Sequence, residues 1–163
     1  MRSIYSEIGD TVRFSKTVSE ADVYMYAGIT GDFSHNHINE AFMSKSKYGR
    51  RIAHGALLVG FMSTASTLMM DRSLEKGIDF TPVSLGYDRV RFLAPVFFGD
   101  TVDVIYTVSE VDEARGRTRA EVKVLNQDGV LVAVGEHLGK WVPNSETKLD
   151  TDVMAEAIVT PSA

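Results

Sequence analysis

"GALLVGFMSTASTLMM", residues 55–70, is the longest apolar stretch in this chain of 163 residues. It falls short of the roughly 20 apolar residues that a membrane-spanning helix needs, and it includes several hydroxyl side chains. A helix from Gly55 to Asp71 would be about 25 Å long, because an α-helix rises about 1.5 Å per residue. Such a helix is apolar on nearly all sides, so we expect protein to surround it. The run therefore predicts a central core helix around which the rest of the fold is built.

Four segments after this helix have patterns typical of β-strands. Their residues alternate between apolar and polar or are rich in β-branched side chains, and turn residues separate them. The segments are PVSLGYDRVRFLAPV (82–96), DTVDVIYTVSEVDE (100–113), RTRAEVKVLN (117–126) and LVAVGEHLGKWV (131–142). Residues 126–129, NQDG, predict a hairpin turn between the last two. Helices followed by such strands indicate an α+β fold in which a curled antiparallel sheet wraps the long central helix.

Two shorter helices are expected before the central helix. Ser19 and Asp22 form an S-x-x-D capping pattern for the first, and Gly28 would end it. Asn39 is a suitable N-cap for the second, which would stop at Gly49.

The composition indicates one globular domain over residues 1–142, followed by a small and polar segment, 143–163, that we expect to be a loosely held tail. The net charge of -5 argues against nucleic acid as a partner, because phosphate contacts need a concentrated basic face. Since the chain has no cysteine, a disulfide framework and a zinc–thiolate site are excluded. Residues 1–16 contain no continuous apolar segment, so we expect no secretory signal, no membrane partner and a cytoplasmic location.

Residues 30–37, TGDFSHNH, place one carboxyl group and two imidazoles in a short polar stretch. In the simplest interpretation, Asp32 caps a turn by accepting hydrogen bonds from backbone groups. A metal site is the second interpretation, but it needs further ligands, and only His54 and His137 remain as histidines. The spacing is not diagnostic, so we expect no metal. His35 is expected to stabilise the loop, His54 to fix the loop-to-helix turn, and His137 to be satisfied within the sheet.

Acid–base chemistry is the third interpretation of this segment. The imidazole of His37 titrates near neutral pH, and the carboxylate of Asp32 would orient it and support its charged form. A reaction that develops negative charge on oxygen also needs a donor, and a backbone N–H at the start of a helix suits that role. Gly55 opens the central helix, where the absence of a side chain lets a substrate carbonyl approach the backbone. These residues have the parts for chemistry on a carbonyl conjugate.

Three spaced segments resemble the MaoC-like dehydratase family, whose members include the (R)-specific enoyl-CoA hydratases. The segments are YAGITGDFSHNHINEAF, RRIAHGALLVGFMS and RVRFLAPVFFGDTV, within a similarity that runs over about residues 12–141. The family pattern is approximately G-D-x-N-P-L-H, then H-G, then F-x-x-P-V-x-x-G-D. The matching residues are Gly31, Asp32, His37, His54, Gly55, Phe92, Pro95, Val96, Gly99 and Asp100. The chain departs from the pattern at Ser34, His35 and Asn36, which leaves the backbone of the loop and the substrate open.

The resemblance implies a hotdog fold, normally dimerised, and reversible addition of water to a trans-2-enoyl-CoA to give an (R)-3-hydroxyacyl-CoA. Asp32 and His37 would activate the water, the Gly55 N–H would polarise the thioester carbonyl, and Ser63 would lie near the active site. No metal or redox cofactor is implied, because CoA is part of the substrate and the thioester itself accepts the electrons. The expected partners are an acyl-CoA and a second copy of the chain.

Two other functions stay open. A hotdog acyl-CoA thioesterase would use the same fold and ligand but release the thiol, and a non-catalytic acyl-thioester-binding subunit would bind without turnover. The basic run KSKYGRR has two interpretations as well, either a solvated helix end or a contact for the CoA phosphates. The candidate phosphate contacts are Lys45, Lys47, Arg50 and Arg51.

Overall fold

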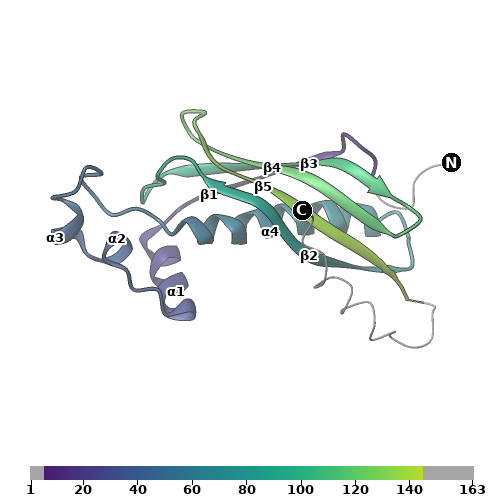
Figure 1. The fold of residues 1–163 in the computed structure, drawn as a ribbon, viewed down its shortest axis with the longest axis horizontal. Coiled ribbons are helices and arrows are strands. Elements are labelled where there is room, and N and C mark those ends of the chain that lie inside the picture. Colours follow the sequence, from purple (N-terminus) through teal and green to yellow (C-terminus); the bar gives the residue numbers. More distant parts are fainter. Residues whose placement is uncertain (1–5, 145–163) are drawn as a thin grey trace, which may run out of the picture.

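A computed structural model of the chain describes residues 6–144, and Figure 1 shows how their elements are arranged. Nearly all of the expected tail, residues 143–163, lies outside the described residues. The elements are β1 (Thr11–Thr17), α1 (Glu20–Thr30), α2 (His35–Ile38), α3 (Glu40–Met43), α4 (Gly55–Leu74), β2 (Phe80–Phe92), β3 (Thr101–Asp112), β4 (Arg117–Asn126) and β5 (Leu131–Pro143). Within this range, no helix is long and apolar enough to cross a membrane.

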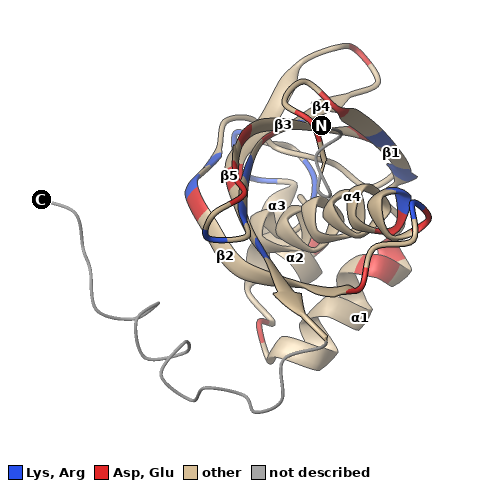
Figure 2. Ribbon diagram, turned by 90° about the vertical axis from the view of Figure 1, so that its right-hand side faces the viewer, with Lys and Arg blue, Asp and Glu red and all other residues tan. Residues whose placement is uncertain are grey.

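The strands form one five-stranded antiparallel sheet in the order β1-β3-β4-β5-β2. Figure 2 shows this sheet curling around α4, with α1, α2 and α3 grouped beyond one end of it in Figure 1. The arrangement confirms the expected α+β class and the hotdog architecture, a long helix wrapped by a curled antiparallel sheet.

The core lies between the concave face of the sheet and one side of α4. Successive side chains of a strand point to opposite faces, so every second residue of a central strand reaches the helix. The buried residues of β3 are Val102, Val104, Tyr106 and Val108. The buried apolar residues of α4 are Leu58, Met62, Ala65 and Met69, and their spacing of three or four places puts them on one side of the helix.

The other side of α4 is open, which corrects the expectation that protein surrounds the whole helix. Leu68 is 41% exposed, and Gly60, Ser63 and Thr67 are exposed as well. The single curled sheet covers only one side, and small and hydroxyl-bearing residues of the apolar run lie on the uncovered one.

The helix starts were predicted better than the helix ends. Ser19 and Asp22 form the expected capping box. Helix α1, however, continues past Gly28 to Thr30, and Gly31 ends it with a φ of 79°. Asn39 caps α3 as expected by accepting a hydrogen bond from the Phe42 N–H, but that helix ends at Met43 and not at Gly49. Serine and glycine in the following residues favour turns over a continued helix.

Backbone hydrogen bonds attach the helices α1 to α3 to the end of the sheet. The Val18 N–H donates to the Asp100 carbonyl, and the Gly99 N–H donates to the Val18 carbonyl, both at 2.8 Å. Further along, the Ala53 N–H donates to the Val96 carbonyl at 2.8 Å. Residues 19–52 are therefore held at both ends, which fixes where the 30–37 segment lies.

Candidate active site

His37 lies in α2 and is oriented by the backbone of the segment that precedes α4. Its Nδ1 lies 2.8 Å from the carbonyl oxygen of Ile52. Since a carbonyl only accepts, Nδ1 carries the proton, and the neutral ring has its lone pair on Nε2. The half-buried position lowers the pKa of His37, with a further lowering by His54, against the opposing effects of the Ile52 hydrogen bond and Asp32. The ring is thus held neutral with Nε2 available as a proton acceptor.

Asp32 follows the left-handed Gly31 and is open to solvent. Its side chain is 52% exposed, and its Oδ1 accepts a hydrogen bond from the Ser34 N–H at 3.2 Å. That hydrogen bond is the turn-capping role of the simplest interpretation. The second carboxylate oxygen, Oδ2, lies 3.8 Å from Nε2 of His54, so the carboxylate keeps an oxygen free for a polar ligand while it stabilises the turn.

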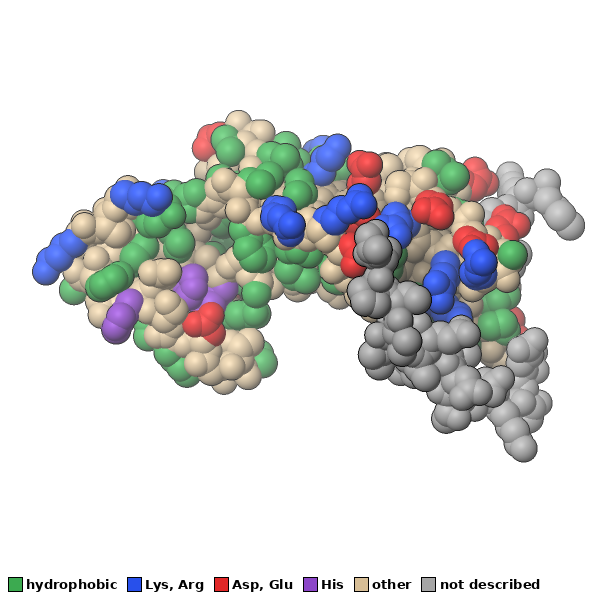
Figure 3. Space-filling model, in the orientation of Figure 1, with side chains coloured by type: hydrophobic (Ala, Val, Ile, Leu, Met, Phe, Trp, Pro, Cys, Tyr) green, Lys and Arg blue, Asp and Glu red, His purple; other side chains and the backbone are tan. Residues whose placement is uncertain are grey.

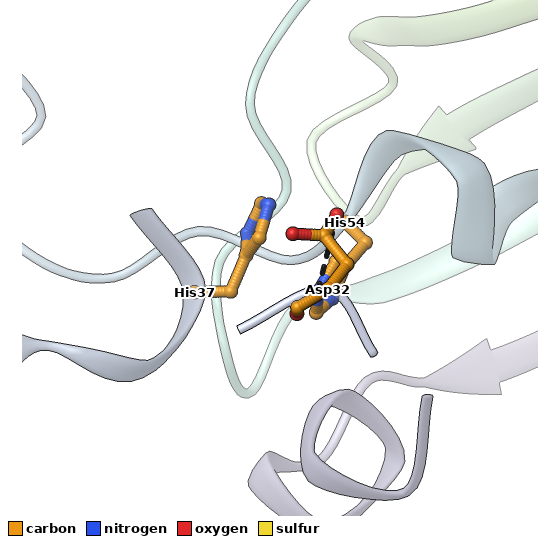
Figure 4. Close-up of side chains that lie close together, drawn as sticks. All are labelled: Asp32, His37 and His54. Carbon is orange, nitrogen blue, oxygen red and sulfur yellow. Dashed lines mark hydrogen bonds and ion pairs between the residues drawn. The ribbon is translucent and has the colours of Figure 1, made fainter. Parts of the chain in front are cut away.

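His54 stands directly before α4 and joins the other two residues (Figure 4). Its side chain is 2% exposed, and its Nε2–H donates to the backbone carbonyl of Asp32 at 3.0 Å. Its ring stacks on the ring of His37, with centroids 3.7 Å apart and planes 30° apart. The hydrogen bond agrees with the expected role in fixing the turn. The stack on His37 was not foreseen, because a separation of residues in sequence carries no information about how two rings face each other.

Asp32, His37 and His54 each offer a possible metal-ligating atom, and these atoms lie within 4.8 Å of one another. An imidazole binds a metal through a lone pair in the plane of its ring. In stacked rings these lone pairs run side by side and do not converge on one ion. His54 also uses Nε2 to hold the Asp32 carbonyl. The arrangement of donors therefore fits a metal poorly, and the absence of a metal stays a prediction that this geometry supports.

A pocket of about 280 Å³ opens beside His37. Its lining is mostly apolar and comes from the segment before α4, the start of α4 and the segment after β2: His37, Tyr48, Ile52, Ala53, Gly55, Leu58, Phe92, Leu93, Ala94, Pro95 and Val96. A largely apolar pocket with a few polar groups at its wall is typical of small-molecule sites. The pocket brings the predicted residues His37 and Gly55 to the same cavity.

Gly55 begins α4, so its N–H has no acceptor within the helix and, among residues 6–144, makes no other hydrogen bond. The positive end of the helix dipole adds to its ability to hold an anionic oxygen. The ring of Phe92 lies against this glycine, and a Cβ placed on residue 55 would come within 2.6 Å of Phe92 Cδ2. A side chain at residue 55 would therefore require the Phe92 ring to move.

The structure places Ser63 away from the other site residues. It lies on the uncovered side of α4, about 12 Å along the helix axis from Gly55 at about 1.5 Å per residue, and it does not line the pocket. Its neighbour is Tyr87 on β2. Burial raises the pKa of Tyr87, while the hydroxyls of Ser66 and Ser63 lower it by less.

The four basic residues also separate into two groups. Arg51 is only 16% exposed and binds Glu20 at 2.7 Å and Glu40 at 2.8 Å. Burial lowers its pKa, but the hydrogen bonds to Glu40 and Glu20 outweigh burial and raise it. Arg51 therefore ties α1 to α3, and its charge is already neutralised.

Lys45, Lys47 and Arg50 are exposed and lie in none of the ion pairs found among the described residues. Lys47 lies over the ring of Tyr48, which lines the pocket, and Arg50 lies over the ring of Phe97. Figure 3 shows basic side chains and histidines exposed at the same end of the molecule, the end that carries α1, α2 and α3. These three cations remain available to an anionic ligand.

Comparison with known families and proteins agrees with this geometry. The model of the family described as "MaoC like domain" matches residues 3–130. The (R)-specific enoyl-CoA hydratase of Rhodospirillum rubrum is 36% identical over 101 residues, which cover 62% of this chain and 65% of the relative. The 3-hydroxybutyryl-CoA dehydratase of Methylorubrum extorquens is 34% identical over 140 residues, covering 86% of this chain and 83% of the relative.

A solved structure gives the same answer for the fold. The (R)-hydratase from A. caviae, described as involved in PHA biosynthesis, superposes with a TM-score of 0.71 at 29% sequence identity. The match covers 83% of this chain and 96% of that one.

Proposed function

Because the chain belongs to the MaoC-like domain family, we propose that it is a hydro-lyase acting on acyl-CoA thioesters. It adds water reversibly across the double bond of a trans-2-enoyl-CoA and yields an (R)-3-hydroxyacyl-CoA. The relatives named as (R)-specific enoyl-CoA hydratase and 3-hydroxybutyryl-CoA dehydratase support this reaction. The observation that carries it in this chain is that His37 and Gly55 line the same pocket, and that within residues 6–144 neither Nε2 of His37 nor the Gly55 N–H has a hydrogen-bond partner.

The proposed mechanism assigns one task to each group. A water molecule donates a hydrogen bond to the Asp32 carboxylate and gives its other proton to Nε2 of His37 as its oxygen bonds to C3 of the enoyl group. The π electrons of the C2–C3 bond move to the thioester carbonyl oxygen, where the Gly55 N–H stabilises the enolate. His37 then returns the proton to C2. Neither a metal nor a redox cofactor takes part.

Exposed cations near the pocket support a CoA ester as the substrate. Lys45, Lys47 and Arg50 carry charges that no carboxylate of the described residues neutralises, as phosphate recognition requires. Arg51 is left out of this set because it is bound to Glu20 and Glu40. We propose that Ser63 acts through Tyr87 and not on the reacting atoms.

A homodimer in the cytoplasm is part of the same proposal. The free edge of β2 runs over residues 80–92 and exposes Val83 and Leu85, and the uncovered side of α4 exposes Leu68. A long unpaired edge and an open apolar helix face favour association with a second copy. Light scattering coupled to size-exclusion chromatography would measure the mass, and a monomer at working concentration would contradict the dimer.

The function is tested by following conjugated-enoyl ultraviolet absorbance with trans-2-enoyl-CoAs of short, branched and carboxylated acyl chains. A thiol reagent runs in parallel, with Asp32→Asn and His37→Ala as controls. Loss of absorbance without thiol release, abolished in both variants, is the expected result. Thiol release would identify a thioesterase. Ligands that raise the melting temperature without being consumed would identify a binding subunit.

A further inference from the structure

We infer that His54 is a positioning residue for both members of the proposed catalytic pair, holding Asp32 through its backbone and His37 through its ring. The inference rests on the proposed function for its effect on turnover, but its structural content stands on contacts alone. Of Asp32, His37 and His54, only His37 lines the pocket, and His54 is the most buried of the three. Its action is therefore expected to reach the substrate through the other two residues.

The first contact fixes the aspartate loop. The Nε2–H of His54 donates to the Asp32 carbonyl at 3.0 Å, across a separation of 22 residues. The Asp32 side chain is exposed. The other described hydrogen bonds of Asp32 stay within its own turn, from the Ser34 N–H to its carboxylate and from its own N–H to the Thr30 hydroxyl. Without the His54 hydrogen bond, little else ties the peptide of Asp32 to the start of α4.

The second contact fixes the imidazole of His37. One face of that ring lies on the His54 ring at 3.7 Å, while Nδ1 is held by the Ile52 carbonyl. The hydrogen bond at Nδ1 alone would still allow the His37 ring to rotate about the line from Nδ1 to the Ile52 oxygen. Stacking on the His54 ring prevents this rotation. The direction of the Nε2 lone pair is thus set by two residues, Ile52 and His54.

The remaining nitrogen of His54 shows that packing alone does not explain this residue. Because Nε2 carries the proton, Nδ1 is an acceptor, and it is buried without a hydrogen-bond partner among the described residues. An unsatisfied buried polar atom destabilises the folded state, so an apolar ring would fill this space more favourably. The histidine at this position uses both its N–H and its flat ring.

The charge state of His54 matters to His37 as well. The titratable side chains in contact with the His54 ring are Asp32, His37 and Tyr26, whose ring lies 4.8 Å away. Positive charge on both stacked imidazoles is unfavourable, and His54 accordingly lowers the pKa of His37. Loss of the imidazole at position 54 should therefore make His37 easier to protonate.

Two substitutions separate the two contacts. His54→Gln keeps an N–H donor that can reach the Asp32 carbonyl but removes the ring, and His54→Phe keeps a ring but removes the donor. The matched control is His35→Ala, which changes a nearby exposed histidine. Its ring lies 5.3 Å from the ring of Phe42, and among the described residues it has no hydrogen bond or ring contact with Asp32 or His37. Each variant is compared with the wild type in kcat, KM and the pH titration of the His37 ring followed by NMR.

We expect kcat to fall by about 10- to 100-fold in His54→Phe, since small misplacements of reacting groups have effects of this size. KM should change less than about threefold, because His54 is not part of the pocket wall. The NMR titration of His37 should move to higher pH in His54→Gln, and His35→Ala should behave as the wild type does.

Wild-type kcat in His54→Phe, or an unchanged His37 titration in His54→Gln, would overturn the inference. If the His54→Phe variant does not fold, the kcat and the His37 titration of the His54→Gln variant test the inference. The NMR titration needs no turnover, so it tests the effect of His54 on His37 separately from the proposed hydratase function. If the wild type hydrates no enoyl-CoA, the proposed function fails while the coupling of His54 to His37 is still tested.

Discussion

His137 in the sheet and the His37–His54 pair at its end place the same side chain in opposite situations. His137 is fully buried, and both of its nitrogens are bonded, Nδ1 to the Tyr106 hydroxyl at 2.8 Å and Nε2 to the Ser84 hydroxyl at 2.9 Å. The pair instead leaves Nε2 of His37 free at a pocket and Nδ1 of His54 with no partner among the described residues.

The difference lies in hydrogen-bonding capacity and not in burial or pKa alone. Burial lowers the pKa of both His37 and His137, and that of His137 to about 4. A perturbed pKa by itself would therefore mark His137 as the stronger candidate. What distinguishes the site is an unused lone pair next to a cavity, because only such a group can act on a ligand.

The largest expected effect separates the two histidines by activity. His37→Ala should lower kcat/KM for enoyl-CoA hydration by about 10²- to 10⁴-fold, the usual contribution of a general base, with little change in unfolding midpoint. His137→Gln should do the reverse, keeping kcat within about threefold while lowering stability. Enzyme assays and urea unfolding of both variants measure this. Equal activity losses in the two would break the contrast.

Acid should destabilise the protein through His137. The pKa of its imidazole is about 4 in the folded state against 6.5 for the free side chain, so the unfolded chain binds the proton more tightly. The related stability is fully present above pH 6.5 and is lost as the pH falls towards 4, by up to about 3 kcal/mol at about 1.4 kcal/mol per pH unit.

Urea unfolding at pH 7.5 and pH 4.5 tests this titration. His137→Gln should lose less stability between the two pH values than the wild type does. His37 has its pKa lowered as well and adds to the loss in the same direction in both proteins. Identical losses in the wild type and the variant would assign the acid sensitivity to other groups.

Removal of one partner of His137 should have a smaller effect. Tyr106→Phe leaves Nδ1 of the buried imidazole without its hydroxyl, and an orphaned buried polar group typically costs about 1–3 kcal/mol. Tyr106 is 3% exposed, so water cannot easily replace the hydroxyl. Urea midpoints at pH 7.5 give the loss, and unchanged enoyl-CoA turnover is the matching expectation. A stable variant with impaired turnover would contradict the separation of the two regions.

The basic side chains show the same contrast between a group with partners in the protein and groups that can bind a ligand. The expected effects of changing them are the smallest. Arg51→Ala should lower the melting temperature by about 2–4 °C because it releases Glu20 and Glu40, with little change in KM. Arg50→Ala and Lys47→Ala should raise KM for the CoA ester by about two- to fivefold, and less so at high salt. Steady-state kinetics at two ionic strengths, together with thermal melts, compare them. An Arg51→Ala variant with the larger KM effect would reverse the assignment.

The strands could be predicted closely because alternation is a local signal. Residues 117–126 form β4 as predicted. Strand β3 is one residue shorter than predicted at each end, and β5 starts as predicted and extends one residue further. The predicted strand 82–96 ends earlier, at Phe92, after two register shifts and a left-handed Arg89 with φ of 51°. No sequence pattern predicts such irregularities, because they depend on how β2 pairs with β5 in the folded sheet.

The sequence predicted those site residues whose side chains have a recognisable chemical role, but not how they are arranged in space. The sequence pointed to Asp32, His37 and Gly55, because carboxylate, imidazole and a helix-opening glycine each have a recognisable role. It did not reveal that His54 stacks on His37, nor that Ser63 lies on the uncovered side of α4. The A-H-G order before the helix was the available signal for His54, but ring orientation depends on packing between segments far apart in the chain.

The junction of Val18 with Gly99 and Asp100 has a consequence for how the protein folds. It joins residues roughly 80 positions apart, and closing a flexible loop of that length costs about 4 kcal/mol of chain entropy by its length dependence alone. The hairpins β3–β4 and β4–β5 involve neighbouring segments and can form earlier. The segment that carries Asp32 and His37 lies inside the long loop, so its native shape must wait for that closure. A refolding chain would then form the β3–β4 and β4–β5 hairpins before the segment that carries Asp32 and His37 reaches its native shape.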